Sequence, residues 1–416
     1  VDSELRYHCD ITIGDDIIGE LNEVISFYCK FCSLQSEGRL NQFSNVFQEK
    51  YECQEIPLLV ALDPEIGIGY PPNHGQADSP VIVSKFKKFI NNHYNRYVTV
   101  DTILLNKLLD LNKHGKKEIV FEDKDFENIN YIKKVPDVLF CIFKIVKDNT
   151  CHIVEPQIGT SPTSIIGRFG YMNQEIENLL KNISQKEQDF VDDAIYAEIK
   201  HVPSSRIGNI NNITHIWDYE ILLLTGSQKS ESAQIPVSDL MLSNRNGVLV
   251  LRSKKLNKRV IPVLSNAHKY DFDTQPVYKF LCDLQYQGRK GYLCFDWGNL
   301  RQVLNHFPRV RYNNTIISLE SWILNVNEIE KICINKNMID EIRCQREIPR
   351  YVYLVDGDNT LLVDFNSQAS SDAFISTIKN RHEIVLKETM IDEFKDNDFP
   401  YANECIVPLY NGTKKK

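Results

Sequence analysis

The sequence lacks the features of a membrane or exported protein. No apolar run reaches the roughly 18 residues that a membrane-spanning helix needs. The densest run, Val138 to Val146, has nine residues and is already interrupted by Lys144. The N-terminus has no basic stretch followed by an apolar one, so nothing in it directs export, and without an initial Met it leaves a trimmed fragment open. We therefore expect a chain with no membrane span.

The sequence also lacks the motifs of several common enzyme classes. It has no Gly-rich loop ending in Gly-Lys-Ser/Thr, no HExxH and no GxSxG, so nucleotide hydrolysis, zinc proteolysis and serine-hydrolase chemistry lack their required parts. Gly67 and Gly69 lack the third glycine of a dinucleotide-binding loop, and Pro71 and Pro72 block the helix that would have to follow. The ten His residues form no ligand-spaced cluster, which favours structural roles for them and predicts no metal site.

The cysteines do not form the framework of a small disulfide-rich protein. Eleven Cys are spread irregularly over 416 residues, which fits free thiols in a reducing cytoplasm. Cys29 and Cys32 form the one close pair, but no second pair accompanies them and they lie late in an amphipathic helix. We expect them to pack in a core.

Length and composition predict an ordinary globular protein of two or three domains. Hydrophobic residues make up 42% and charged residues 25%. We expect an α+β fold of several subdomains, with mixed or antiparallel sheets and flanking helices. The expected parts are a helix-rich subdomain over 1–132 with an N-terminal strand at 5–13, a mixed, strand-rich basic subdomain over 133–312, and a small α/β subdomain over 313–416.

Hydrophobic periodicity places the main elements. Apolar residues from Ile17 to Phe31 recur at spacings of three and four, which predicts a helix, and Phe43, Phe47 and Tyr51 mark a second one. The Pro- and Gly-rich stretch over 63–72 is typical of a loop. Short apolar runs separated by turn residues predict hairpins at 138–154 and 351–365.

Positive charge gathers in the middle of the chain. The net charge is −8, yet residues 201–312 hold fifteen Lys and Arg against eight Asp and Glu, a local +7. Five of these cations fall within eight residues of a predicted hairpin, and we call them the basic turn: Arg252, Lys254, Lys255, Lys258 and Arg259. A polyanion could dock on the basic turn. A solvated hairpin tip has the same composition, so both interpretations stay open.

Two segments combine small residues with a cation. Residues 158–170 form a predicted loop whose free backbone N–H groups, with Arg168, could hold an anion. Residues 203–209 follow a predicted strand and would project Arg206 beside Ser and Asn donors. Each segment is also compatible with an ordinary loop whose polar groups are satisfied internally.

Ten short segments follow one another along the chain: FQEKY (47–51), DPEIGIGYP (63–71), GRF (167–169), PSSRIGN (203–209), DYE (218–220), VLRSKKLNKRVIP (250–262), FLCDLQ (280–285), FPRVRY (307–312), GDN (357–359) and IVP (406–408). Their order resembles that of the class I lantibiotic dehydratases. No single segment is diagnostic, but they run in the family's order over almost the whole chain, and the covered region looks like the later part of the glutamylation domain. The resemblance includes no counterpart of the family's leader-peptide-binding winged helix, of several catalytic cations with a Thr, or of the elimination domain.

The resemblance implies a tRNA-dependent glutamyl transferase, the dehydratase component of lanthipeptide biosynthesis, of which this chain holds a part. Family members esterify a Ser or Thr hydroxyl of a precursor peptide with glutamate from glutamyl-tRNA, and later eliminate the glutamate to leave a dehydroamino acid. No cofactor is implied beyond glutamyl-tRNA as co-substrate. The implied partners are glutamyl-tRNA, the precursor peptide and the remaining dehydratase segments, with a cyclase left open.

The resemblance also suggests site residues. Arg206, in the PSSRIGN segment, matches an Arg implicated in glutamyl transfer, and Asn45 falls where a functionally important Asp is expected, so its catalytic role departs from the pattern. Arg168 and the basic turn match the family more loosely, and we assign them to tRNA binding. A peptide aminoacyl-tRNA ligase and a non-catalytic scaffold for tRNA or peptide remain alternatives.

Overall fold

Three β-sheets with flanking helices make up the part of the protein that the structure describes, which confirms the expected α+β class. The computed structural model describes residues 12–32, 38–72, 100–127, 136–148, 150–202, 214–289, 291–390 and 404–410. All but the last two residues of the expected N-terminal strand lie outside this part. In the described residues no helix is both long and apolar enough to cross a membrane.

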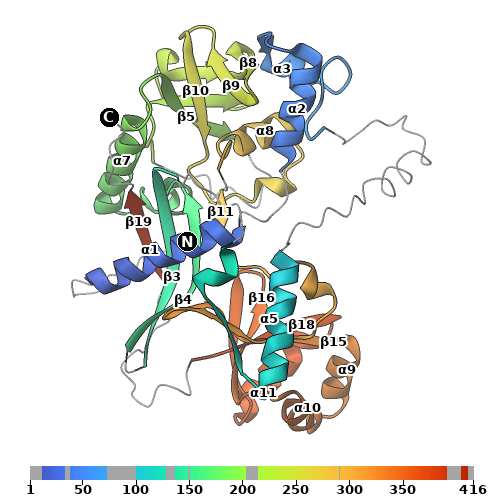
Figure 1. Cartoon of the computed structure of the whole chain (residues 1–416). Coiled ribbons are helices and arrows are strands. Elements are labelled where there is room, and N and C mark those ends of the chain that lie inside the picture. The colour runs from blue at the N-terminus through green and yellow to red at the C-terminus, as the bar shows by residue number, and fades with distance from the viewer. Residues whose placement is uncertain are drawn as a thin grey trace.

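Sheet A lies in the upper part of Figure 1 and is antiparallel on one side and parallel on the other. The order is β1 (Ile56–Pro57), β8 (Leu240–Arg245), β9 (Val248–Ser253), β10 (Lys258–Val263), β5 (Ala194–His201), β6 (Tyr219–Leu223) and β7 (Gln234–Pro236). Neighbouring strands from β1 to β10 are antiparallel to each other, and neighbouring strands from β10 to β7 are parallel.

Helices cover both faces of sheet A. One face packs on α2 (Arg39–Tyr51), α3 (Leu58–Ala61) and α8 (Pro276–Leu284), and Phe43, Phe47 and Phe280 are fully buried there. The other face packs on α6 (Thr163–Ile166) and α7 (Gln174–Asp189) through Leu180, Tyr196 and Trp217. Successive side chains of a strand point to opposite faces. The side chains of β5 therefore lie alternately on the face covered by α2, α3 and α8 and on the face covered by α6 and α7.

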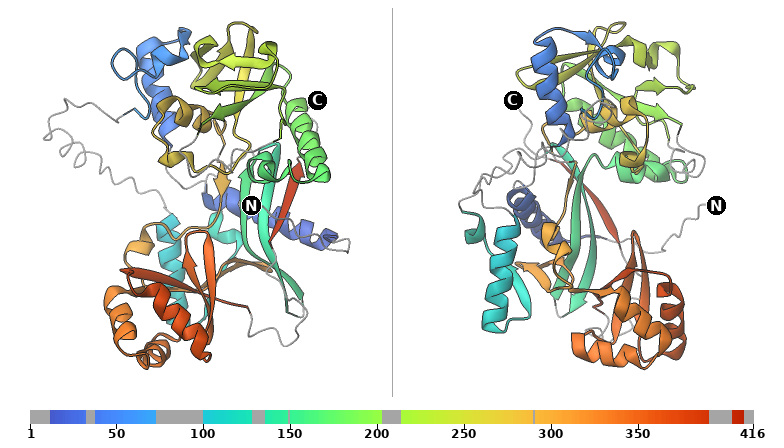
Figure 2. Two further views of the ribbon diagram at one scale, coloured as in Figure 1. Left: turned by 180° about the vertical axis from the view of Figure 1, so that it is seen from behind. Right: turned by 90° about the vertical axis from the view of Figure 1, so that its right-hand side faces the viewer.

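Sheet B forms the middle of the molecule. Its long hairpin of β3 and β4 runs between the part that holds sheet A and the part that holds sheet C, as Figures 1 and 2 both show. The order is β19 (Cys405–Tyr410), β3 (Val138–Asp148), β4 (Thr150–Thr160), β14 (Thr315–Ser318), β13 (Arg309–Tyr312) and β2 (Glu118–Phe121), with β11 (Tyr292–Leu293) paired to β4.

The helix α1 (Asp15–Phe31) packs on sheet B with α5 (Val100–His114). The side chains predicted from its periodicity are buried, and the Tyr28 hydroxyl donates to the Pro156 carbonyl at 2.7 Å. Cys29 and Cys32 are buried thiols, as expected, and burial raises the pKa of the Cys29 thiol.

Sheet C is antiparallel and is covered by three helices in the lower part of Figure 1. Its strands are β12 (His306–Phe307), β15 (Ser321–Asn325), β18 (Glu383–Glu388), β16 (Tyr351–Asp356) and β17 (Asn359–Asp364), and its helices are α9 (Val326–Ile334), α10 (Met338–Arg346) and α11 (Gln368–Ile378). The β16–β17 pair confirms the hairpin predicted over 351–365. Short 3₁₀ helices occur at η2 (Asp123–Phe126), η3 (Gly167–Phe169), η4 (Glu231–Ala233), η5 (Val237–Asp239), η6 (Tyr270–Phe272) and η7 (Gly298–Gln302).

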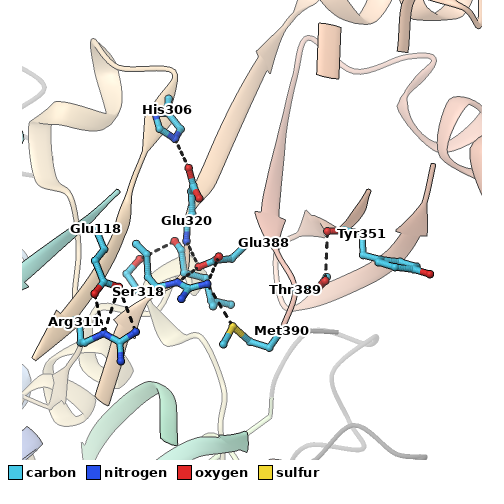
Figure 3. A network of polar contacts seen from close by, with 11 residues as sticks. Glu118, His306, Arg311, Ser318, Glu320, Tyr351, Glu388, Thr389 and Met390 are labelled. Atoms are coloured by element: carbon cyan, nitrogen blue, oxygen red, sulfur yellow. Dashed lines mark hydrogen bonds and ion pairs between the residues drawn. The ribbon is translucent and has the colours of Figure 1, made fainter. Parts of the chain in front are cut away.

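An ion pair joins sheet B to sheet C. Arg309 of β13 donates through Nε and Nη2 to the two carboxylate oxygens of Glu388 of β18, at 2.8 and 2.6 Å. The Glu320 backbone N–H also donates to Glu388 at 2.8 Å, a contact that Figure 3 shows beside Met390. Glu388 is only 7% exposed. Its charge therefore depends on these donors in place of water.

Removing one member of this pair should destabilise the protein. Arg309→Ala leaves a buried carboxylate without its cation, so we expect a loss of roughly 3 kcal/mol in the free energy of unfolding. Urea unfolding followed by tryptophan fluorescence, to which Trp322 in sheet C contributes together with the buried Trp217 and Trp297, measures this loss. Arg381→Ala, which breaks the exposed pair with Asp356, is the control and should cost less than about 1 kcal/mol. Equal losses in the two variants would contradict the buried-pair account.

Candidate functional site

Two buried carboxylates lie side by side in sheet A. Glu198 of β5 and Glu220 of β6 are paired in register on neighbouring parallel strands, and they are 3% and 1% exposed. Two like charges so close and so shielded from water cannot both be stable without protons or compensating partners. We call these two residues, with Lys200, His215, Ser227 and Ser265, the carboxylate cluster.

Polar partners surround Glu220. His215 Nδ1 lies 3.1 Å from its Oε1, and Lys200 Nζ lies 3.7 Å from the same oxygen. The Ser227 hydroxyl donates to its other oxygen. Lys200 and His215 are themselves partly exposed, at 22% and 47% of their side-chain area, so they connect a buried carboxylate with solvent.

Glu198 depends on Ser265, which lies two residues after the end of β10. The Ser265 backbone N–H donates to Glu198 Oε1 at 3.0 Å, and the Trp217 indole N–H donates to the Ser265 hydroxyl at 2.9 Å. Burial raises the pKa of Glu198 to about 7, although Lys200 and the donors of Ser265 act in the opposite direction. Glu198 therefore changes its protonation state close to neutral pH.

Gly167 allows a short helix to approach Ser265. A Cβ atom at position 167 would lie 2.2 Å from the Ser265 carbonyl oxygen, so the close contact requires a glycine. This contact brings the GRF segment to the carboxylate cluster, which also contains Glu220 of the DYE segment. Segments more than fifty residues apart in the sequence therefore meet at one place.

The opposite face of β5 carries a second, more enclosed polar group. His201 Nε2 lies 3.1 Å from Asp273 Oδ2, and the imidazole stacks on Tyr278 with ring centroids 4.2 Å apart. The His201 side chain is only 9% exposed. His268 bonds the Tyr278 hydroxyl through Nδ1 at 2.8 Å, and burial lowers the pKa of His268. These contacts tie α8 and its preceding segment to the sheet.

A further polar hollow lies between sheets B and C. It encloses about 280 Å³ and is lined by Tyr28, Glu155, Arg301 and Lys387 among others. Lys387 Nζ bonds Glu155 at 2.6 Å across the two sheets. Neither the GRF nor the DYE segment lines this hollow, whereas both segments reach the carboxylate cluster, which we therefore take as the candidate site.

Several predicted site residues are not brought together by the structure. Arg206 lies outside the described residues, but its segment is bracketed by Lys200 before it and His215 after it, which both contact Glu220. Asn45 is exposed on α2, next to the buried Ser44. Arg168 is exposed on η3, with its guanidinium 4.6 Å from the Phe169 ring centroid.

The basic turn connects β9 and β10, as the predicted hairpin requires. Arg252 is already engaged by Glu55, through Nε at 2.7 Å and Nη2 at 2.5 Å. Lys255 Nζ donates to the Glu231 carbonyl at 3.1 Å, and Arg259 lies 3.9 Å from Asp193. Lys254 and Lys258 are exposed. The turn is thus partly neutralised and partly open to an anion.

The prediction of a loop over 158–170 is wrong. Its first residues belong to β4, and the rest form α6 and η3. The backbone N–H groups of Ser164, Ile165, Ile166 and Gly170 are used in local hydrogen bonds to carbonyls of the same segment. Small residues occur here because the segment packs closely on Ser265, as Gly167 and the buried Thr163 show.

Sequence reasoning missed the carboxylate cluster. Glu198 is the one acidic residue among Ala194–Ile199, which are otherwise apolar or aromatic, and an acidic residue in such a run is a signal of a buried charge. Glu220 stands in a segment already recognised as typical of the family. The pairing of the two across parallel strands, and the partner role of His215, depend on non-local contacts that the sequence does not display.

Comparison with known proteins agrees with this architecture. Among solved structures, the tRNA-dependent lantibiotic dehydratase MibB from Microbispora sp. 107891 superposes with a TM-score of 0.76 at 19% identity, over 95% of this chain and 39% of that one. The glutamylation domain of TbtB from thiomuracin biosynthesis superposes with a TM-score of 0.58 at 16% identity, over 93% and 49%. These likenesses show that the chain has the fold of this class.

The sequence itself gives the family. Residues 1–374 match the family described as lantibiotic dehydratase, N terminus, and the chain belongs to that family. It is 22% identical to the subtilin biosynthesis protein SpaB of Bacillus subtilis, over 96% of this chain and 40% of SpaB. It is 24% identical to the epidermin biosynthesis protein EpiB of Staphylococcus epidermidis, over 91% and 37%. The chain thus spans about two fifths of these relatives, and the resemblance inferred from the ordered segments is confirmed.

The raised pKa of Glu198 predicts a pH-dependent effect of Glu198→Gln. Folded Glu198 holds its proton up to about pH 7, whereas an unfolded Glu loses it near pH 4.5, so this group lowers the stability of the unmodified protein as the pH rises between these values. Gln cannot ionise. We expect the variant to match the unmodified protein at pH 5 and to exceed it by on the order of 1–3 kcal/mol at pH 8.

Urea unfolding at the two pH values measures the difference between variant and unmodified protein. Glu330→Gln, at an exposed position of α9, is the control and should show the same small difference at both. A Glu198→Gln variant that is less stable at pH 8 than at pH 5, relative to the unmodified protein, would show that Glu198 is held as an ion.

Proposed function

We propose that this chain supplies part of the site that transfers glutamate from glutamyl-tRNA to Ser or Thr hydroxyls of a ribosomally synthesised precursor peptide. Glutamate elimination to dehydroamino acids would follow. The observation that carries the proposal is the carboxylate cluster, which in a chain of the lantibiotic dehydratase family unites the GRF and DYE segments and brackets the segment of Arg206. The tRNA co-substrate would place the reaction in the cytoplasm.

The proposed reaction suits a protein without a nucleotide-hydrolysis motif. The aminoacyl ester of charged tRNA is already activated, and acylation converts a poor hydroxide leaving group into a carboxylate. The protein then has to align two macromolecules and to stabilise the negative charge that develops on the attacked carbonyl oxygen. Lys200 provides a partly exposed cation at the cluster, and we assign Arg206 the binding of a carboxylate or of the ester oxygen.

The remaining segments of the enzyme are part of the proposal. Because the chain spans about two fifths of its curated relatives, we expect the leader-peptide-binding and elimination functions to come from other segments, with a cyclase acting afterwards on the product. Asn45 is exposed on α2 and keeps its proposed role only if such a segment covers it.

A transfer assay tests the proposal directly. The chain, supplied with the remaining segments except the one that eliminates glutamate, is incubated with glutamyl-tRNA and the precursor peptide, and the peptide is analysed by mass spectrometry. We expect a gain of one glutamyl unit per modified Ser or Thr, labile to mild base as an ester is, and a large loss of this gain with Arg206→Lys at unchanged thermal stability. Uncharged tRNA is the control.

Two other products would contradict the proposal. An amino acid joined to the peptide by a base-stable amide would favour the aminoacyl-tRNA ligase alternative. No covalent change, combined with retained binding of tRNA or peptide, would favour the scaffold.

Charge reversal of the basic turn tests tRNA binding. If its lysines contact phosphates, each contact releases counterions and contributes roughly 0.7–0.9 to the slope of log affinity against log salt. We expect the triple change of Lys254, Lys255 and Lys258 to Glu to weaken tRNA binding and to flatten this slope. The matched control reverses three exposed lysines near the end of α5: Lys113, Lys116 and Lys117.

The measurement is a filter-binding or fluorescence titration at several salt concentrations. Unchanged tRNA affinity of the basic-turn variant at low salt, where surface charges are least screened, would show that the turn is a solvated tip. An equal loss in both variants would show a non-specific effect of net charge.

A further inference from the structure

The carboxylate of Glu220 orients the imidazole of His215 through a hydrogen bond. His215 Nδ1 lies 3.1 Å from Glu220 Oε1, and the carboxylate is held rigidly because it is 1% exposed and has further partners in Ser227 and Lys200. In a neutral imidazole only one nitrogen carries the proton. A hydrogen bond from Nδ1–H to Glu220 therefore leaves the lone pair on Nε2, for which the described residues provide no partner.

The charges around the pair favour this arrangement. The groups that face His215 are Glu220 and, next to it, Lys200 of β5 and Glu198. Lys200 gives the Glu220 carboxylate a positive partner that does not depend on protonation of the imidazole. His215 is also the open member of the cluster, since 47% of its side chain is exposed.

We infer that His215 is the general base of glutamyl transfer and that Glu220 is its positioning residue. The inference rests on the proposed function. The hydroxyl oxygen of the peptide Ser or Thr attacks the carbonyl carbon of the aminoacyl ester while its proton moves to His215 Nε2. The bond between that carbon and the ribose oxygen then breaks, and the imidazolium returns the proton to the ribose oxygen. The products are the glutamyl ester of the peptide and free tRNA, and no other reactant is needed.

The other histidines of the described residues fit this role less well. His201 also contacts a carboxylate, but it is stacked on Tyr278 and 9% exposed, so a peptide hydroxyl cannot reach it. His306 forms a similar pair with Glu320, at 2.7 Å and 50% exposed, but it lies on β12 of sheet C, away from the cluster. Figure 3 shows the pair of His306 and Glu320. His306 therefore provides a matched control for His215.

The first experiment compares His215→Gln with His306→Gln in the full-length protein that contains this chain. Each change removes one half-exposed imidazole from a carboxylate. We expect the rate of the unmodified protein to rise with pH, as general-base catalysis requires. We expect His215→Gln to lower the rate of glutamyl transfer by roughly 10²–10⁴-fold, to remove this rise and to leave tRNA affinity unchanged. His306→Gln should retain both the rate and the pH profile.

Different failures have different meanings. Absence of transfer by the unmodified protein would overturn the proposed function and this inference with it. Transfer by the unmodified protein, together with an unchanged rate and pH profile in His215→Gln, would overturn the inference alone.

The second experiment reads the imidazole directly and does not depend on activity. In the ¹⁵N–¹H spectrum of histidine-labelled protein, the signal that disappears in His215→Gln should show the Nδ1–H tautomer, and Glu220→Gln should change the tautomer populations. An Nε2–H tautomer in the unmodified protein would overturn the inference, because the reacting nitrogen would then already carry a proton.

Discussion

The burial of two acidic side chains on neighbouring strands is the constraint that organises the upper part of the molecule. Glu198 and Glu220 share a row of sheet A, and each needs donors that water cannot supply there. The chain after β10 turns so that the Ser265 N–H reaches Glu198. Gly167 is needed because that turn is pressed against η3. The need of the two buried carboxylates for hydrogen-bond donors thus brings the turn after β10 and the helix η3 close to sheet A.

The same requirement gives the cluster its chemical character. A carboxyl group that titrates near pH 7, a lysine and a half-exposed histidine lie together on one face of the sheet. Such groupings are typical of sites that bind or move protons and charge. Glu388 of sheet C is another buried carboxylate that needs hydrogen-bond donors in place of water. Its donors are Arg309 of sheet B and the backbone of Glu320, which lies between β14 and β15, so this buried charge connects two sheets.

Local patterns allowed much of the fold to be predicted. The period of three and four over Ile17–Phe31 and the apolar runs on either side of turn residues were enough to place α1, β3, β4, β16 and β17, because these signals lie within the sequence of each element. The segment 158–170 was misread because small residues permit either flexibility or close packing. Which of the two applies depends on Ser265, about a hundred residues later.

The site was predictable only in part. Glu220 stood in a recognised segment, but its pairing with Glu198 depends on the register of two parallel strands, which no local pattern encodes. The basic turn was found from its composition, but the neutralisation of Arg252 comes from Glu55, almost two hundred residues earlier. Non-local contacts of this kind decide which charges remain available to a substrate, and the sequence records them only indirectly.

The most direct test of the account is the position of the aminoacyl group in the bound complex. A crystal structure of the protein with a non-hydrolysable, amide-linked glutamyl-adenosine would show it. The account predicts that the glutamyl carbonyl oxygen lies within hydrogen-bonding reach of Lys200 at the carboxylate cluster, beside the exposed side chain of His215. A glutamyl group bound instead in the hollow between sheets B and C, beside Glu155 and Lys387, would contradict it.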